Sequence, residues 1–258
     1  MTSRAEMAGL RPGWSWPQAY WRMVAWEFAD LRLYLPVLSA VLILQGAGLA
    51  LGVGLLFSTV PRAAAVFLVT GAPVMNLITA GLIFEPQLVA EQRTRGSYEF
   101  LQALPVPRSA AALAWYTVAL VTALPAVALT LFTGVARYHL DLTVSPMVVP
   151  AMLLTCLTGV LLGLAVAHGV TVPMVAMLLS TTLIFVMTGF SPVAFPAGQL
   201  PGWLAAANQW LPFGPMATVV RAALVSGVAS GVPRAYLVVT AWAAGSALVV
   251  AWAQGHRR

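Results

Sequence analysis

The stretch Glu85-Pro-Gln-Leu-Val-Ala-Glu-Gln-Arg-Thr-Arg-Gly-Ser-Tyr-Glu-Phe-Leu-Gln-Ala-Leu-Pro-Val-Pro-Arg108 lies between two long apolar runs of the chain. The chain has 13 basic and 7 acidic residues, and six of these charges fall in this stretch: Glu85, Glu91, Arg93, Arg95, Glu99 and Arg108. An unpaired charge is strongly disfavoured in hydrocarbon. The stretch is therefore expected to lie in water or against a partner protein.

The second half of this stretch has the pattern of a short helix. Gly96 interrupts the chain, Ser97 can cap a new helix, and Pro105 prevents that helix from continuing. Apolar residues then recur on one small face at spacings of three and four: Tyr98, Leu101, and Leu104 or Phe100. Such a face suits insertion into a groove on another protein. An amphipathic helix that rests on lipid headgroups is the alternative.

The composition is that of an integral membrane protein. Of the 258 residues, 60% are hydrophobic, and the mean hydropathy is +0.89. Residues 1–258 are expected to form a single membrane domain. All 13 basic residues are Arg, which excludes a Walker A phosphate loop because that motif requires Lys. Any ATP that drives this protein must therefore bind to another chain.

Residues 15–34 are predicted to form an amphipathic helix after a polar leader. Its apolar residues share one arc at 100° per residue: Tyr20, Trp21, Val24, Phe28 and Leu31. Polar residues, Glu27 among them, are assigned to the remaining surface. The helix is expected to lie along the membrane surface with its aromatic rings at headgroup depth. A simple anchor and an elbow that positions the first span both fit this pattern.

Six apolar segments are long enough to cross the membrane as helices. They are 33–57, 63–84, 109–133, 145–167, 174–190 and 233–253. Nine arginines then fall on the side of the N-terminus: Arg4, Arg11, Arg22, Arg32, Arg93, Arg95, Arg108, Arg257 and Arg258. By the positive-inside rule both termini, the 1–34 region and the 85–108 segment are cytoplasmic, and Arg62, Arg137, Arg221 and Arg234 are outside.

The external connection 191–231 combines five prolines with many large apolar residues. It is too apolar for a solvated loop, so two short helices that dip into the outer leaflet are expected, near 201–209 and 215–225. A seventh span is the competing interpretation, against which the prolines and Arg221 argue.

Two stretches resemble the permeases of type-2 ABC exporters. Glu91-Gln-Arg-Thr-Arg-Gly-Ser-Tyr-Glu-Phe-Leu-Gln-Ala-Leu-Pro-Val-Pro-Arg108 is similar to that family's charged, glycine-containing segment after the second span. Gly189-Phe-Ser-Pro-Val-Ala-Phe-Pro, with Gln199-Leu-Pro-Gly-Trp203 and Leu211-Pro-Phe-Gly-Pro215, is similar to the stretch after the fifth. With the surface helix and the six spans, the resemblance covers nearly the whole chain. Pro212-Phe-Gly-Pro215 departs from the family's commoner Asn-Pro pattern.

The resemblance implies a half-transporter of the bacterial inner membrane. Two permease subunits, identical or homologous, would join two cytoplasmic ATPase subunits that bind ATP and magnesium, so this chain would hold no cofactor and have no enzymatic site. Helix 15–34 would be the connecting helix, 85–108 would contain the coupling helix, and 191–231 the re-entrant external helices. The residues assigned to ATPase coupling are Glu91, Arg93, Arg95, Gly96, Tyr98, Glu99, Leu101 and Leu104. Those assigned to the external gate region are Phe195, Trp203, Trp210 and Phe213.

The predicted spans contain no Asp, Glu, Arg or His except His168 and Arg234 at their edges. Ion-coupled carriers usually need an ionisable group in the membrane, so this pattern favours coupling through 85–108. Neutral polar residues at membrane depth are the candidates for a translocation pathway: Gln45, Asn76, Ser180, Thr181 and Thr182. Ser and Thr also satisfy carbonyls of their own helix. Gly48 and Gly52 permit close helix packing, within one subunit or across a dimer.

The hypothesis is a permease subunit of an ATP-driven exporter that moves a hydrophobic or amphipathic molecule, such as a drug, antibiotic or lipid, outward. Export of a lipid-linked glycan, a membrane enzyme that modifies lipids, and a passive ligand-sequestering subunit are the alternatives. His139, His168 and His256 lie in separate loops, so no metal site is expected. The arginines form no patch for nucleic acid.

Overall fold

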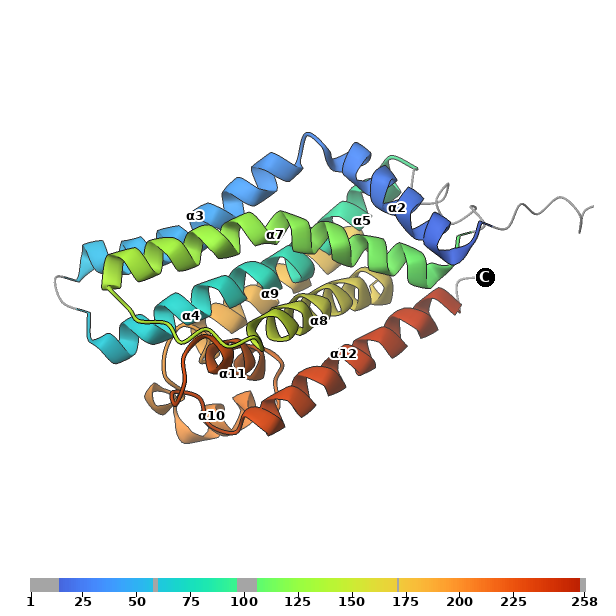
Figure 1. Cartoon of the computed structure of the whole chain (residues 1–258). Helices are drawn as coiled ribbons and strands as arrows, with labels where there is room; N and C mark the ends of the chain where they lie inside the picture. Colours follow the sequence, from blue (N-terminus) through green and yellow to red (C-terminus); the bar gives the residue numbers. More distant parts are fainter. Residues whose placement is uncertain (1–13, 58–59, 97–105, 171, 256–258) are drawn as a thin grey trace, which may run out of the picture.

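The computed structural model describes residues 14–57, 60–96, 106–170 and 172–255. These residues form helices and no strand, and the long helices lie side by side in one bundle (Figure 1). Helices α2, α5 and the C-terminal end of α12 lie at one end of the bundle, which we call the α2 end. Helices α10 and α11 lie toward the opposite end, called the α10 end.

The helices follow in a simple order along the chain. They are α2 (Trp16–Leu31), α3 (Leu35–Leu56), α4 (Arg62–Thr79), the π-helix η1 (Ala80–Phe84), α5 (Glu85–Thr94), α7 (Arg108–Tyr138), α8 (Val148–Gly169), α9 (Pro173–Phe190), the 3-10 turn η2 (Ala197–Gln199), α10 (Gly202–Asn208), α11 (Phe213–Leu224) and α12 (Val232–Gly255). The all-helical prediction is confirmed for the described part of the chain.

Five helical stretches are long and apolar enough to cross a membrane. They are Leu35–Leu56, Arg62–Thr94, Arg108–Tyr138, Val148–Gly169 and Val232–Ala253. They coincide with five of the six predicted spans, so the chain is a multi-pass membrane protein. Residues 174–190 also form an apolar helix, but one that is shorter than the other five. The count of six spans therefore stays a prediction.

The helix that contains the second predicted span does not end at residue 84. The π-helix Ala80–Phe84 joins α4 to α5, and the helix continues to Thr94. The expectation that the whole charged stretch lies in water or against a partner is wrong for Glu85, because only 2% of this residue is exposed. Its neighbour across the helix contact is Gly163 of α8, whose lack of a side chain leaves room for the Glu85 Cβ. The first turn of the stretch, which contains Glu85 and Pro86, is therefore buried by tertiary packing.

Helix α2 is amphipathic as predicted, but its apolar arc packs mainly on protein. Met23 and Val24 are buried against Ala114 of α7, and Tyr20 is hydrogen-bonded to Thr117 across 2.8 Å. Trp21 alone of the predicted arc is largely exposed. The helix is therefore a packed element of the bundle, and only part of its aromatic surface is available to headgroups.

The connection 191–231 contains two short helices, α10 and α11, close to the predicted positions. That they face the outside and dip into the outer leaflet stays a prediction. Helix α11 is buried against α4, α8 and α12, and its Met216 and Val220 are part of the main apolar core. That core also includes Met187 of α9 and Val239 of α12. Arg221, which was assigned to the outside, lies in this packed region with 4% of its surface exposed.

Candidate coupling site at one end of the bundle

The predicted coupling segment is attached to a continuous helix. From Arg62 to Thr94 the chain forms 33 residues of uninterrupted helix, most of it buried inside the protein. The glycine after it, Gly96, has a φ of +75°, a left-handed conformation that glycine adopts without strain and that ends a helix. The prediction that Gly96 breaks the chain is confirmed. The end of α5 that precedes the predicted coupling segment is therefore continuous with a helix that runs through the bundle.

Glu91 and Arg95 connect the last turns of α5 to the elbow between α2 and α3. Tyr34 in that elbow donates a hydrogen bond to Glu91 Oε1 (3.2 Å) and accepts one from Arg95 Nη2 (2.9 Å). Arg95 and Glu91 also form an ion pair one helical turn apart. The groups are exposed, so solvent screens the pair and it adds little stability. Its effect is geometric, because it fixes the end of α5 relative to the elbow.

Arg93 links the same turn to another span. Its Nη2 donates a hydrogen bond to the Ala167 carbonyl oxygen at the end of α8 (3.0 Å). Arg93 also lies in the last turn of α5, where a positive charge is favoured by the helix dipole. Three of the predicted coupling residues, Glu91, Arg93 and Arg95, thus surround one helix end. Four others lie outside the described residues and stay predictions: Tyr98, Glu99, Leu101 and Leu104.

A buried carboxyl group next to this end was missed by sequence reasoning. Glu27 of α2 is completely buried and accepts a hydrogen bond from Gln92 Nε2 of α5 (3.3 Å). Burial, and secondarily the charge of Asp30, raises the pKa of Glu27 to about 8, while the Gln92 hydrogen bond opposes this. The signal was present, since Glu27 follows Val24 by three residues and precedes Leu31 by four, on the apolar arc.

The predicted pathway residues fall into two groups. In the first group, Gln45 of α3 donates a hydrogen bond to Thr79 of α4 (3.1 Å), and Asn76 of α4 donates one to Thr130 of α7 (3.1 Å). Each of these two side chains therefore connects one long helix to another. The other three residues lie on α9: Ser180, Thr181 and Thr182. Ser180 is buried, and the other two bond carbonyl oxygens of their own helix. No hydrogen bond joins the two groups within the described chain, and their role as a pathway stays a prediction.

The predicted external gate residues have different environments. Trp203 and Trp210 are largely exposed at the α10 end, whereas Phe213 is buried in the main core and Phe195 is partly buried. Trp210 is held in place by Arg234, whose guanidinium carbon lies 4.4 Å from the centre of the indole ring. Phe213 therefore has a packing role, and the two tryptophans are the members of the set with free surface.

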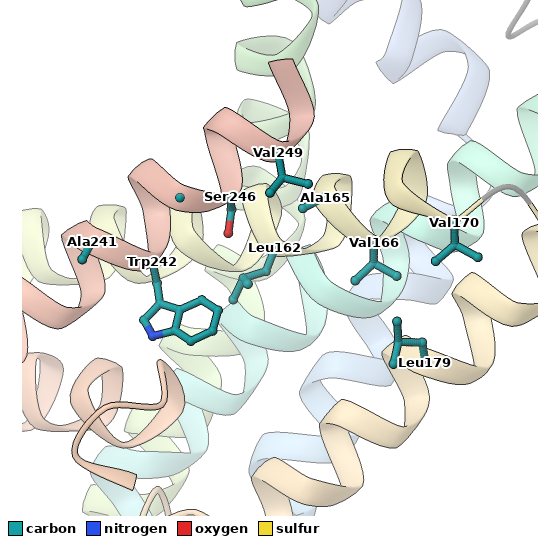
Figure 2. Close-up of a pocket in the computed structure, with 10 residues that line it drawn as sticks. Leu162, Ala165, Val166, Val170, Leu179, Ala241, Trp242, Ser246 and Val249 are labelled. Atoms are coloured by element: carbon teal, nitrogen blue, oxygen red, sulfur yellow. The ribbon is translucent and has the colours of Figure 1, made fainter. Parts of the chain in front are cut away.

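An apolar groove lies between α8, α9 and α12 (Figure 2). Its volume is about 590 Å³, and it opens along the side of the bundle. Leu162 and Val166 form one wall, Leu179 faces them from α9, and Trp242 and Ser246 come from α12. The indole N–H of Trp242 donates to the Trp210 carbonyl oxygen (2.8 Å), so the groove presents almost no free polar group. Such a groove suits an alkyl or aromatic group.

A known family matches a region that includes both the candidate coupling site and helices α10 and α11. Residues 19–225, most of the chain, match the family described as ABC-2 type transporter. The matched region runs from α2 to the residue after α11. No curated protein matched the chain.

Proposed function

Because the chain belongs to the ABC-2 type transporter family, we propose that it is the permease subunit of an ATP-driven exporter. ATP and magnesium would bind to two copies of a separate cytoplasmic ATPase, docked at the α2 end around 85–108. A second permease subunit, identical or homologous, would complete the complex. The substrate would be a hydrophobic or amphipathic small molecule, such as a drug, an antibiotic or a lipid.

The uninterrupted helix from Arg62 to Thr94 carries this proposal. A docked ATPase that changes its shape would push on the segment after Gly96, and the helix would transmit that movement to α4 in the centre of the bundle. The hydrogen bonds of Tyr34, Glu91 and Arg95 would make α3 move with it. ATP closure in the partner would thus be converted into a rearrangement of the first two spans.

The exposed apolar sides of α3 and α9 support a paired permease. Leu44, Leu55 and Phe185 each expose more than two thirds of their surface, and other apolar side chains of α3 and α9 are exposed as well. A Cβ added at Gly48 or Gly52 of α3 would meet no neighbouring helix of the described residues, so these positions leave room for a second helix to approach. We place the second permease on these sides, with lipid covering what remains.

The apolar groove between α8, α9 and α12 supports the proposed substrate class. The groove is lined almost entirely by apolar side chains, so a molecule dissolved in the membrane would enter it without crossing a polar surface. A substrate with a long carbohydrate would find few hydrogen-bond partners there, so the groove favours an amphiphile over a lipid-linked glycan.

The decisive experiment reverses one charge at each end of the bundle. The complex with its ATPase is reconstituted in liposomes, and Glu91→Lys is compared with Asp141→Lys. Glu91 anchors the end of α5, whereas Asp141 is an exposed residue at the α10 end that pairs with Arg62. Substrate-stimulated ATPase activity should fall about tenfold or more in Glu91→Lys and stay unchanged in Asp141→Lys.

Membrane insertion should be normal in both variants. Full coupling in Glu91→Lys would contradict the proposed coupling site. Transport that continues without nucleotide and stops with a protonophore would contradict ATP drive altogether, since Glu85 is an ionisable group buried in the second span.

A further inference from the structure

Arg221 of α11 is a buried cation without a charged partner. Only 4% of its surface is exposed, and no carboxylate of the described residues forms an ion pair with it. Burying a lone guanidinium is strongly unfavourable unless hydrogen bonds compensate. A charged residue kept in such a place in a membrane protein indicates a function.

The guanidinium of Arg221 joins two separate parts of the chain. Its Nε donates to Thr70 Oγ1 of α4 (3.0 Å), and its Nη2 donates to the Val193 carbonyl oxygen (2.5 Å). Thr70 donates its own hydroxyl proton to the Val66 carbonyl oxygen, so its lone pairs can accept. The guanidinium carbon also lies 4.0 Å from the centre of the Phe67 ring. Three groups therefore hold Arg221 between α4 and the turn 191–194.

The turn 191–194 lies directly on α4. A side chain at Gly71, the residue after Thr70, would collide with the carbonyl group of Val193. Val193 is fully buried, and it belongs to the same apolar core as Met216 of α11. The turn after α9 and helix α11 thus meet α4 at one place, with Arg221 between them.

We propose that Arg221 is the positioning residue of the external region, which holds the turn 191–194 on α4 in the closed arrangement and releases it when the region opens. The release rests on the proposed function, because it requires α4 to move during the ATP cycle. The holding contact is a property of this chain alone.

The two acceptors of Arg221, the Thr70 hydroxyl and the Val193 carbonyl oxygen, explain why the contact can hold the turn on α4 and can still be broken. A carboxylate partner would form an ion pair, and pulling that pair apart would leave two buried charges. Here the acceptors are a hydroxyl and a carbonyl oxygen, which are neutral. When water enters between α4 and the turn, it hydrates the guanidinium and removes the unfavourable desolvation of the closed arrangement. The buried charge therefore favours opening once the contact loosens.

Thiol labelling at position 193 measures this contact. Val193→Cys is introduced in a Cys156→Ala background, and the purified complex with its ATPase is treated with a maleimide in detergent, with and without ATP. The shielded thiol of the parent should react slowly without nucleotide. Arg221→Gln should raise that rate about tenfold or more, since two charge-assisted hydrogen bonds are lost. Arg221→Lys should be intermediate, because an ammonium group does not span both acceptors.

The controls separate the contact from general damage. Arg62→Gln removes an equally charged but exposed residue at the same end of the bundle and should not alter labelling. Thr70→Val removes one acceptor with little change of shape, and it provides the same test if Arg221→Gln does not assemble. ATP should raise the labelling rate of the parent and have little effect on that of Arg221→Gln. Loss of a residue with only a structural role would not remove this response to ATP.

Equal shielding of the thiol in Arg221→Gln, Thr70→Val and the parent would overturn the proposal. The comparisons without nucleotide do not depend on ATP, so they test the positioning role even if the proposed function is wrong. Parent labelling that ATP never changes, in a complex that transports with ATP, would overturn the release step and leave the exporter proposal intact.

Discussion

At the scale of single residues, the structure differs most from the sequence-based expectations at three charged side chains that are buried. Glu27, Glu85 and Arg221 each have less than a twentieth of their surface exposed. Each was placed outside the apolar spans by its charge, and each lies at the contact of two or more helices. Arg221 is matched by neutral acceptors and an aromatic ring, whereas Glu27 meets a glutamine. Their charge alone therefore predicted that these three residues face solvent, whereas helix packing buries them.

The raised pKa of Glu27 predicts how stability depends on pH. Its ordinary value is 4.5 and its folded value is about 8, so the folded state holds the proton more tightly than the unfolded state. The contribution of Glu27 to the free energy of unfolding is therefore fully present below about pH 4.5 and is lost as pH rises toward about 8, by at most about 1.4 kcal/mol per pH unit. Glu27→Gln keeps the shape without the titration and should flatten thermal stability over this range.

Thermal unfolding in detergent between about pH 5 and 8 tests this expectation. Asp141→Asn removes an exposed carboxylate and serves as the matched control. An equal pH slope in Glu27→Gln and the parent would show that Glu27 is hydrated in solution.

At the scale of elements, the π-helix Ala80–Phe84 is the segment that connects two helices of the bundle and packs on a third. It connects α4 to α5 and packs on α8 so closely that a side chain at Gly81 would collide with the backbone of Gly159 and Val160. Backbone atoms cannot rotate away as a flexible side chain can. The close contact between these two helices thus depends on the absence of a Cβ at this position.

Gly81→Ala should therefore destabilise the protein by about 1–3 kcal/mol, since the added methyl group forces α8 and η1 apart. The matched variant is Gly189→Ala on α9, where no atom lies near the new methyl group, and it should be neutral. Melting temperatures of the two purified variants provide the comparison. A Gly81→Ala protein as stable as the parent would mean that the π-helix shifts to accommodate the methyl group.

At the scale of the whole molecule, the helices differ in how much apolar surface they expose. Helices α4 and α11 are closely packed, whereas α3 and α9 carry broad exposed apolar surfaces. In a membrane such surfaces contact either lipid or another subunit. Gly48 and Gly52 fit the proposed second subunit, because small residues allow helices to approach closely, whereas contact with lipid does not require them.

Gly52→Ile should therefore weaken pairing of two permease chains without unfolding either one. Cross-linking of tagged and untagged copies in the membrane measures pairing, and the melting temperature of each chain monitors folding. Gly245→Ile on α12, also open to its surroundings, is the control on the opposite side. Unchanged pairing in Gly52→Ile would place the second subunit elsewhere.

Much of the fold could be predicted because membrane helices are encoded locally. Apolar length determined five spans, and the helix-breaking Gly96 and the prolines of 191–231 marked the breaks correctly. The resemblance in Glu91–Arg108 indicated the family, which the match over residues 19–225 confirms. These features are properties of short segments, in which the free energy of transfer and the backbone preferences act without a tertiary partner.

Only the tertiary structure decided which polar residues are inside. The extension of the second span to Thr94, the burial of Glu85, the hydrogen bond of Glu27 and the holding contact of Arg221 all depend on helices far apart in the chain. Whether a charge faces water depends on what packs on the other side of its helix. Periodicity shows which residues share a face, but not which neighbour covers that face.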